Sequence, residues 1–435
     1  MATDLFYGLL PDHLVLALML ALMLLESLRV PPAWGRIVYL ALLGGAGAAL
    51  AHQIANGYVA DIAGGEVIID RFALSAKAVL VTLGFTAGIA LPRAMSYKTW
   101  LLLASSLFGA LIMMDSAGFV ALFLGIEMLS LPAFALMVHQ RGASVAAEGA
   151  FKYLLMSSIA TALLLFGMSL AYMSTGSLAI ADFVAIVGSG RGLDTAATLL
   201  MLAGFFMKAA VFPLHGWAPD AYSAAPLPVT AFLASVVKGA VVLALVRVFA
   251  AATLDATVVT VVTALALASI VYGNLAALAQ TRFRRLLAYS SVAHAGYMIF
   301  ALAGATGSRA DDLLWYVGIY AAATLLACAS YAVLARDKGN GDDARDELDT
   351  LDGGFARHPL AAVLLALAVL SLAGLPPLPG FFAKLFIFQS AIASGHLVPA
   401  VLAFAGSFIG LGYYVAIVVR LFRSDTMVQP MQQPQ

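Results

Sequence analysis

Four charged side chains lie deep inside long apolar stretches of this sequence, where they could bind and release protons. They are Glu127 in FVALFLGIEMLSLPAF, Lys208 in MLAGFFMKAAVFPLHGW, Lys238 in TAFLASVVKGAVVLAL and Lys384 in LAGLPPLPGFFAKLFIF. A charge at the centre of a bilayer costs about 2.5–3.5 kcal/mol on insertion scales, so each must be paired, hydrated or neutralised. Burial favours neutral lysine and protonated glutamate, whereas a nearby opposite charge favours both ionised forms. A buried glutamate–lysine pair is therefore poised between two protonation states.

The choice of basic residue supports proton transfer over a static scaffold. Every basic residue inside the apolar stretches is a lysine, and every arginine lies in a loop or at the end of a stretch. A buried lysine can lose its proton, whereas arginine effectively cannot. The pattern therefore favours a proton relay.

Prolines and histidines lie close to the lysines. Pro213 cannot donate a hydrogen bond to the carbonyl of Ala209, so we expect the helix to open beside Lys208. Carbonyl groups freed inside a membrane must be met by water or polar groups, and water is what a proton path needs. His294, in RRLLAYSSVAHAGYMIF, and His215 could pass protons because histidine titrates near neutral pH. Packing without proton transfer is the alternative for both histidines.

Two further lysines favour structural interpretations when only their spacing is considered. Lys77 lies near the start of its apolar stretch and could extend toward the membrane surface. Lys152 follows Glu148 by four residues, which is the spacing of an ion pair along one helix.

Composition places the chain in a membrane. Of 435 residues, 63% are apolar and 11% charged, against about 45–50% and 25% in soluble domains. The 23 basic and 23 acidic residues balance, so nothing indicates nucleic acid as a partner. A single cysteine, Cys328, excludes an internal disulfide and a cysteine-ligated iron–sulfur or zinc site.

The apolar stretches predict an all-α polytopic membrane protein with about 13 transmembrane helices, because each is long enough to cross a bilayer. The stretch at 358–392 contains Pro376, Pro377, Pro379 and Gly380 and predicts one broken helix. The predicted spans are 12–30, 37–55, 72–92, 98–116, 118–138, 148–173, 195–215, 227–248, 256–279, 285–304, 312–335, 358–392 and 397–421.

Basic residues predict the orientation of these spans. Eighteen lie in loops or at the ends of the spans, and fourteen of them belong to loops after odd-numbered helices. Only Arg71, Arg191, Arg247 and Arg309 follow even-numbered helices. Because cytoplasmic loops are enriched in lysine and arginine, the N-terminus is predicted to be periplasmic and the C-terminus cytoplasmic in a bacterial inner membrane.

Similarity between two segments of the chain predicts two inverted repeats. AFLASVVKGAVVLALVRVF at 231–249 resembles VLAFAGSFIGLGYYVAIVVRLF at 401–422, and each follows a proline-interrupted stretch with a lysine. Paired broken segments in two repeats point to a transport site. We expect an N-terminal three-helix segment (1–97), two five-helix repeats (98–249 and 250–422), each with one broken helix, and a polar cytoplasmic tail (423–435).

From about residue 100 to 420 the sequence resembles the antiporter-like subunits of respiratory complex I, and most closely the N subunit. The resemblance lies in LFLGIEMLSLPAFAL, KAAVFPLHGWAPDAYSAAPLPVTAFLASVVK, GNLAALAQTRFRRLLAYSSVAHAGYM and SLAGLPPLPGFFAKLFIF, in this order. N subunits usually have a fourteenth helix, which is not predicted here.

The resemblance implies a role for each matching residue. It makes Glu127 the helix-5 glutamate and Lys208 its helix-7 partner, with Lys152 a helix-6 lysine that modulates the pair. It makes Lys238 a connecting lysine, His294 the histidine of a central polar axis and Lys384 the lysine that ends the path.

The implied function is proton translocation in the membrane arm of an NADH–quinone oxidoreductase. The resemblance implies that NADH, FMN, iron–sulfur clusters and quinone are bound by partner chains and that this chain holds no cofactor. The implied partners are an M-type antiporter-like neighbour, small K- and J-type subunits, and lipid.

Three alternatives stay open at this point. The chain could serve a multisubunit Na⁺/H⁺ antiporter or a membrane-bound hydrogenase, which share these motifs. It could be a stand-alone H⁺-coupled transporter, or a scaffold subunit that moves no protons.

Overall fold

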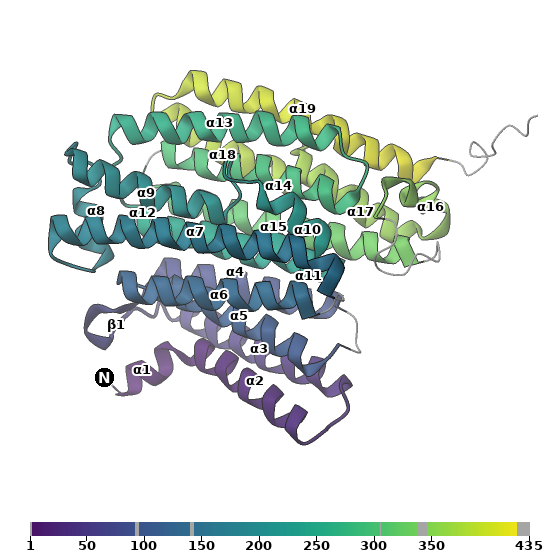
Figure 1. Ribbon diagram of the computed structural model, residues 1–435, viewed down its shortest axis with the longest axis horizontal. Helices are drawn as coiled ribbons and strands as arrows, with labels where there is room; N and C mark the ends of the chain where they lie inside the picture. The colour runs from purple at the N-terminus through teal and green to yellow at the C-terminus, as the bar shows by residue number, and fades with distance from the viewer. Residues whose placement is uncertain (1, 92–94, 140–142, 305, 337–345, 424–435) are drawn as a thin grey trace, which may run out of the picture.

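Long helices run side by side through the whole molecule (Figure 1). The computed structural model describes residues 2–91, 95–139, 143–304, 306–336 and 346–423. Within these residues, 11 helices are long and apolar enough to cross a membrane. The predicted all-α membrane architecture is therefore confirmed. The count of thirteen stays a prediction, because it needs two interrupted helices to be counted as one crossing each.

The N-terminal segment forms one edge of the bundle (Figure 1). It contains α1 (Ala2–Gly8), α2 (Leu10–Ser27), α3 (Ala33–Ala55) and α4 (Arg71–Ala90). Between α3 and α4 the chain forms a hairpin of two short antiparallel strands, β1 (Ala60–Ile62) and β2 (Val67–Ile69). The sequence predicted neither α1 nor this hairpin, because the strands are only three residues long.

The next group of helices contains the first interruption. It comprises α5 (Tyr97–Asp115), α6 (Phe119–His139), α7 (Ala143–Thr175), α8 (Ile180–Ile186), α9 (Gly192–Lys208), α10 (Trp217–Ala224), α11 (Leu227–Phe232) and α12 (Lys238–Phe249). A π-helical turn (Leu233–Val237) joins α11 to α12. The opening predicted beside Lys208 is confirmed, since α9 ends at Lys208 and α10 begins only at Trp217; the predicted span 195–215 is therefore interrupted near its end.

The last group repeats this order of elements. It comprises α13 (Ala256–Leu278), α14 (Phe283–Phe300), α15 (Arg309–Arg336), α16 (Gly354–Arg357), α17 (Pro359–Ala373), α18 (Pro379–Ala393) and α19 (Leu397–Phe422). The predicted break in 358–392 is confirmed between α17 and α18. Of the predicted polar tail, residues 424–435 lie outside the described part of the chain.

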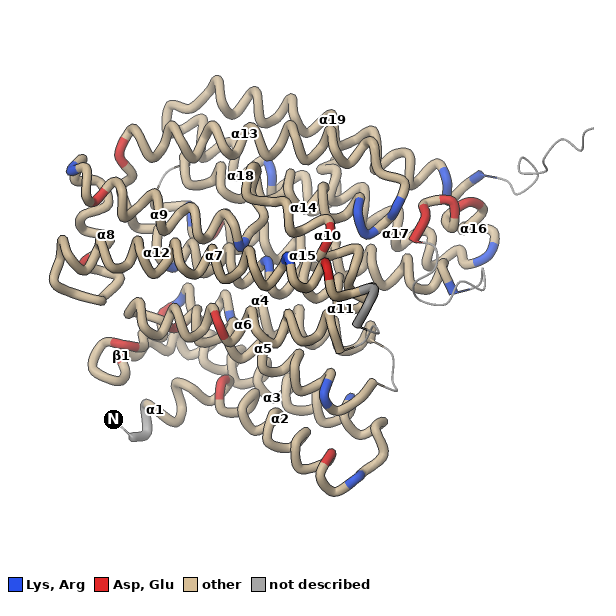
Figure 2. The backbone as a smooth tube through the Cα atoms, viewed as in Figure 1, with Lys and Arg blue, Asp and Glu red and all other residues tan. Residues whose placement is uncertain are grey.

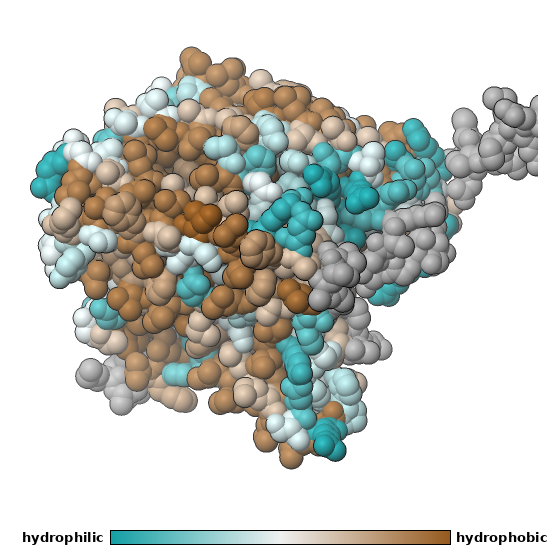
Figure 3. All heavy atoms as spheres, viewed as in Figure 1, coloured by the Kyte–Doolittle hydropathy of each residue, from teal (hydrophilic) through white to brown (hydrophobic). Residues whose placement is uncertain are grey.

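The helices that carry the candidate residues lie at the centre of the bundle. In Figure 1, α12, α14 and α15 lie between the N-terminal helices on one side and α13 and α19 on the other. Almost every residue of α12 and α14 is buried, whereas α2, α7, α13 and α19 expose many large apolar side chains. Apolar residues cover most of the face shown in Figure 3, and hydrophilic residues gather toward the end with α16. Figure 2 shows the same contrast in charge, with a few charged positions inside the bundle.

Matching glycines bring the first two helices of each group into close contact. A Cβ atom on Gly109 of α5 would lie 2.7 Å from the carbonyl oxygen of Gly125 on α6. A Cβ atom on Gly296 of α14 would lie 2.7 Å from the carbonyl oxygen of Ala266 on α13. Small residues let backbones approach in membranes, where close packing drives helix association. The two pairs α5–α6 and α13–α14 are thus built alike.

Replacing Gly296 with valine is expected to destabilise the bundle, because its side chain would collide with the α13 backbone. Inserting extra groups into a packed interior costs about 1–3 kcal/mol. We expect less protein in the membrane and a lower thermal unfolding midpoint. Gly307→Val is the matched control, since no atom lies within 4 Å of a Cβ there. Equal midpoints for the two variants would contradict this packing argument.

Candidate functional site

Lys208 is the last residue of α9, where the first interrupted helix opens. Its Nζ atom lies 3.9 Å from Oε1 of Glu127 on α6 and donates hydrogen bonds to Oγ of Ser130 (3.1 Å) and Ser157 (2.8 Å). Glu127 Oε1 accepts a hydrogen bond from Thr161 Oγ1 at 2.6 Å. The Lys208 side chain is 4% exposed and that of Glu127 is 28% exposed. The predicted pair therefore forms, at the long limit of an ion pair and surrounded by hydroxyl groups.

A small cavity joins Lys208 to Lys238. The cavity volume that is open to the centre of a water molecule is about 20 Å³. The cavity is lined by both lysines and by Ser130, Ser157 and Tyr222. A cavity of about 10–15 Å³ on this measure can hold one water if it offers polar partners. This cavity satisfies both conditions, so water can connect the two amines.

Lys238 is buried and bonded to a neutral partner. It follows the π-helical turn of Leu233–Val237, a type of turn that often occurs at functional sites. Its Nζ atom donates hydrogen bonds to both the carbonyl oxygen and Oγ of Ser291 on α14, at 2.5 Å each. Across the described ranges, no carboxylate oxygen lies within 4 Å of this amine. Lys238 therefore carries its charge, when protonated, without a direct counter-ion.

His294 lies in a cluster of hydroxyl groups one turn along α14. Its Nδ1 atom lies 2.9 Å from the hydroxyl of Tyr316, and its Nε2 atom lies 3.2 Å from that of Tyr414. The Tyr414 hydroxyl in turn lies 2.5 Å from Oγ of Ser290, the neighbour of Ser291. Hydroxyl groups both donate and accept hydrogen bonds, so they can pass a proton along such a chain. Ser291 and Ser290 are consecutive residues of α14, so the contacts of Lys238 and those of His294 lie next to each other.

Lys384 lies at the second interrupted helix. Its Nζ atom donates hydrogen bonds to the carbonyl oxygens of Leu372 (3.1 Å) and Ala373 (2.9 Å), at the end of α17. The amine also lies 4.7 Å from the ring centre of Tyr297, whose ring is 5.9 Å from that of His294. Gly374 ends α17 with φ +84°, and a Cβ there would lie 3.2 Å from Nζ of Lys384. Only glycine suits this position, because it adopts positive φ readily and leaves room for the amine.

The structure therefore brings five of the six predicted residues into one row of neighbouring groups. The row passes from Glu127 through Lys208, the cavity, Lys238 and the hydroxyl cluster of His294 to Lys384.

Lys152 lies apart from this row. Its side chain is 41% exposed, and Nζ lies 2.7 Å from both Glu148 Oε1 and Asp220 Oδ2. Asp220 belongs to α10 and also lies 3.6 Å from Nη1 of Arg285. Lys152 therefore contacts the half-helix that follows the break, and contacts Glu148 as its spacing predicted. Sequence reasoning missed Asp220, although it is a lone carboxylate beside the predicted break.

His215 lies in the break itself, among aromatic rings. Its ring centre lies 5.5 Å from that of Phe212 and 4.8 Å from that of Tyr272. Its Nδ1 atom is buried without a hydrogen-bond partner. This environment agrees with the packing alternative for His215.

The structure corrects the interpretation of Lys77. Its side chain is 1% exposed and does not extend to the surface. Its Nζ atom lies 2.5 Å from Asp12 Oδ2 and also forms an ion pair with Asp115 Oδ2. Spacing along one helix does not reveal these partners, because Asp12 and Asp115 lie at the ends of two other apolar stretches.

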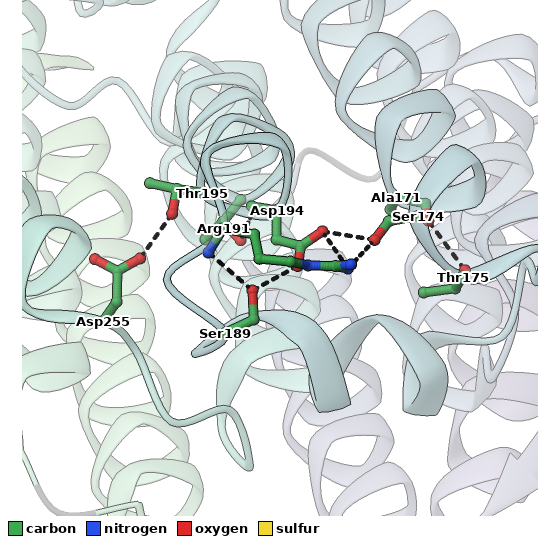
Figure 4. A network of polar contacts seen from close by, with 9 residues as sticks. Ala171, Ser174, Thr175, Ser189, Arg191, Asp194, Thr195 and Asp255 are labelled. Atoms are coloured by element: carbon green, nitrogen blue, oxygen red, sulfur yellow. Dashed lines mark hydrogen bonds and ion pairs between the residues drawn. The ribbon is translucent and has the colours of Figure 1, made fainter.

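A second polar network joins α7, the turn after α8 and the start of α9 (Figure 4). Arg191 Nε lies 2.7 Å from Oδ2 of Asp194, whose carboxylate also accepts hydrogen bonds from Ser174 and Ser189. The Asp194 side chain is completely buried. These contacts fix the start of α9, so they help to position Lys208 at its other end.

The sequence matches, over residues 116–410, a family described as NADH:quinone oxidoreductase/Mrp antiporter, TM. It is 55% identical over 434 residues to NADH-quinone oxidoreductase subunit N of Pelobacter propionicus, covering 99% of this chain and 92% of the relative. The protein of the same name from Desulfovibrio desulfuricans is 35% identical over 405 residues, which cover 88% of this chain and 80% of the relative.

Solved structures share the fold. A chain of respiratory complex I from Thermus thermophilus superposes with a TM-score of 0.81 at 31% identity, covering 95% of this chain and 90% of that one. A chain of the Mrp complex from Dietzia sp. gives a TM-score of 0.83 at 24% identity, over 96% and 81% of the two chains. The second likeness concerns the fold alone.

Proposed function

The chain belongs to the NADH:quinone oxidoreductase/Mrp antiporter family of membrane subunits, and we propose that it is the proton-translocating N-type subunit of an NADH–quinone oxidoreductase. The relatives at 55% and 35% identity bear this name, and the buried ionisable row supplies the means. NADH oxidation and quinone reduction take place in partner chains.

The proposed path begins at Glu127 and Lys208. When the pair is close, both groups are charged; when Glu127 is neutralised or moves away, burial favours neutral Lys208 and the release of its proton. The proton passes through the water cavity to Lys238 and through hydroxyl groups to His294 and Lys384. Lys152 adjusts this step indirectly through Asp220 on α10, since its ion pair joins α7 to the half-helix after the break.

One observation carries the proposal. Three buried lysines share a row with one carboxylate, so the row cannot hold all its positive charges without mutual repulsion. Like charges disfavour each other's ionised forms, and the effect is strong where water is scarce. A proton gained at one lysine therefore favours proton loss at the next.

The surroundings proposed for the chain follow from its surface and loops. We place it in a bacterial inner membrane with its N-terminus periplasmic and its C-terminus cytoplasmic, on the distribution of loop arginines and lysines. The M-type and small K- and J-type subunits are its proposed neighbours. The partly exposed carboxylate of Glu127 on α6 supports a contact with another membrane chain, because a charged group that faces lipid is costly. The proposed repeats span 98–249 and 250–422.

Two other functions remain to be separated by experiment. A subunit of a Na⁺/H⁺ antiporter or membrane-bound hydrogenase predicts a gene neighbourhood without the other complex I subunits. A stand-alone transporter predicts proton movement by the purified chain alone in vesicles.

Glu127→Gln is expected to abolish most proton pumping by the assembled complex. Glutamine preserves the hydrogen bond from Thr161 but cannot be ionised, so it cannot change the charge beside Lys208. Proton pumping would be measured beside the quinone reductase rate in vesicles that contain the complex.

Glu347→Gln is the matched control, because it neutralises an exposed glutamate that belongs neither to the row nor to the contacts around it. Unchanged pumping per quinone in Glu127→Gln would refute the proposed role of the pair.

A further inference from the structure

Asp12, Lys77 and Asp115 form a second buried ionisable cluster that the row from Glu127 to Lys384 does not use. Asp12 lies in the first turn of α2, Lys77 in α4 and Asp115 at the end of α5. The three residues are 6%, 1% and 3% exposed. Lys77 forms ion pairs with Oδ2 of both aspartates. The cluster therefore links the N-terminal segment to the first repeat.

The cluster contains one negative charge too many when all three groups are ionised. Lys77 offers one positive charge to two carboxylates, and burying an unbalanced charge is costly. Asp115 Oδ1 is buried and has no hydrogen-bond partner. Binding a single proton at this oxygen makes the three groups neutral together.

In the described part of the chain, Arg247, which contacts the residue after Asp115, does not supply the missing positive charge. Arg247, in the last turn of α12, donates a hydrogen bond from Nε to the carbonyl oxygen of Ser116 at 3.0 Å. Its Nη1 atom lies 2.5 Å from Asp70 Oδ2, so its charge is already matched. Glu66 of the hairpin lies against Gly118 and adds a further negative charge.

We propose that Asp12, Lys77 and Asp115 are a proton-binding site at the hairpin end of the bundle, separate from the row. Asp115 Oδ1 accepts one proton from water that reaches the slightly exposed Asp12, and returns the same proton on ionisation. Because α12 begins with Lys238 and contacts Asp115's neighbour through Arg247, it connects this site mechanically to the row.

The test is infrared spectroscopy of the assembled complex in lipid vesicles as a function of pH. The carbonyl stretch of a carboxylic acid reports a protonated aspartate, and subtracting variant from wild type isolates one group. We expect a band that Asp115→Asn removes. Asp12→Asn removes a like charge, so the band should vanish at a lower pH; Lys77→Met removes the opposite charge, so it should persist to a higher pH.

Controls keep this test independent of the proposed pumping row. Asp61→Asn removes an exposed carboxylate of the same hairpin and should leave the band in place. Lys208→Met should also keep the band, whatever it does to pumping. Asp115→Asn leaves Lys77 paired with Asp12, so this variant is expected to fold even if Lys77→Met does not. The proposal is overturned if wild type and Asp115→Asn give the same carboxylic acid spectrum at every pH.

Discussion

Replacing Lys208 with methionine is expected to abolish proton pumping by the assembled complex and to slow quinone reduction with it. Methionine is an unbranched side chain that fills irregular space, so the packing at the end of α9 should be retained. Among the described residues, Lys208 is the only basic side chain within 4 Å of Glu127. Loss of the Lys208 amine therefore removes the group whose protonation responds to the charge of the Glu127 carboxylate. Pumping and the quinone reductase rate would be measured on the same vesicles.

Lys208→Arg separates proton transfer from a static ion pair. Arginine keeps the positive charge near Glu127 but effectively cannot release a proton. We expect normal assembly and a loss of pumping as severe as in Lys208→Met. Full pumping by the arginine variant would show that Lys208 serves only as a fixed counter-ion. Lys98→Met, at an exposed position on α5, is the control for removing a lysine without touching the row.

The second large effect is expected at Lys384. Lys384→Met removes the last amine of the row and leaves the carbonyl groups of Leu372 and Ala373 without their donor. A buried polar group that loses its partner costs about 1–3 kcal/mol. We expect loss of pumping together with a moderately lower thermal unfolding midpoint.

Lys384→Gln separates the loss of pumping from the loss of stability. Its amide can still donate hydrogen bonds, so we expect stability close to wild type, yet it cannot carry a proton. A variant that is both stable and active in pumping would remove Lys384 from the proposed path. Arg420→Met is the control, because Arg420 pairs with Asp349 at a partly exposed site where ion pairs contribute little.

The sequence predicted most of the row because each member stands out in its own stretch. A charge among apolar residues and a proline next to it are local features, and they located Glu127, Lys208, Lys238 and Lys384 without any knowledge of packing. Composition and run length likewise predicted the membrane helices, since bilayer thickness fixes their length.

The contacts between distant stretches could not be predicted in this way. Lys77 and Asp12 are 65 positions apart, and Lys152 and Asp220 are 68 apart. Their pairing depends on which helices pack together and how each is rotated, which hydropathy does not specify. Lys77 was misjudged for this reason: its distance from the end of its own helix says nothing about carboxylates on α2 and α5.

The partner of Lys384 has a consequence for how this end of the row responds to acidity. Peptide oxygens at the end of a helix bear roughly half a unit of negative charge. Unlike a carboxylate, they do not titrate, so their attraction for the amine is constant from acid to alkaline conditions. Neutralisation of its own acceptors therefore cannot cause the Lys384 amine to release its proton. A change elsewhere in the chain must do so, such as the arrival of positive charge at His294.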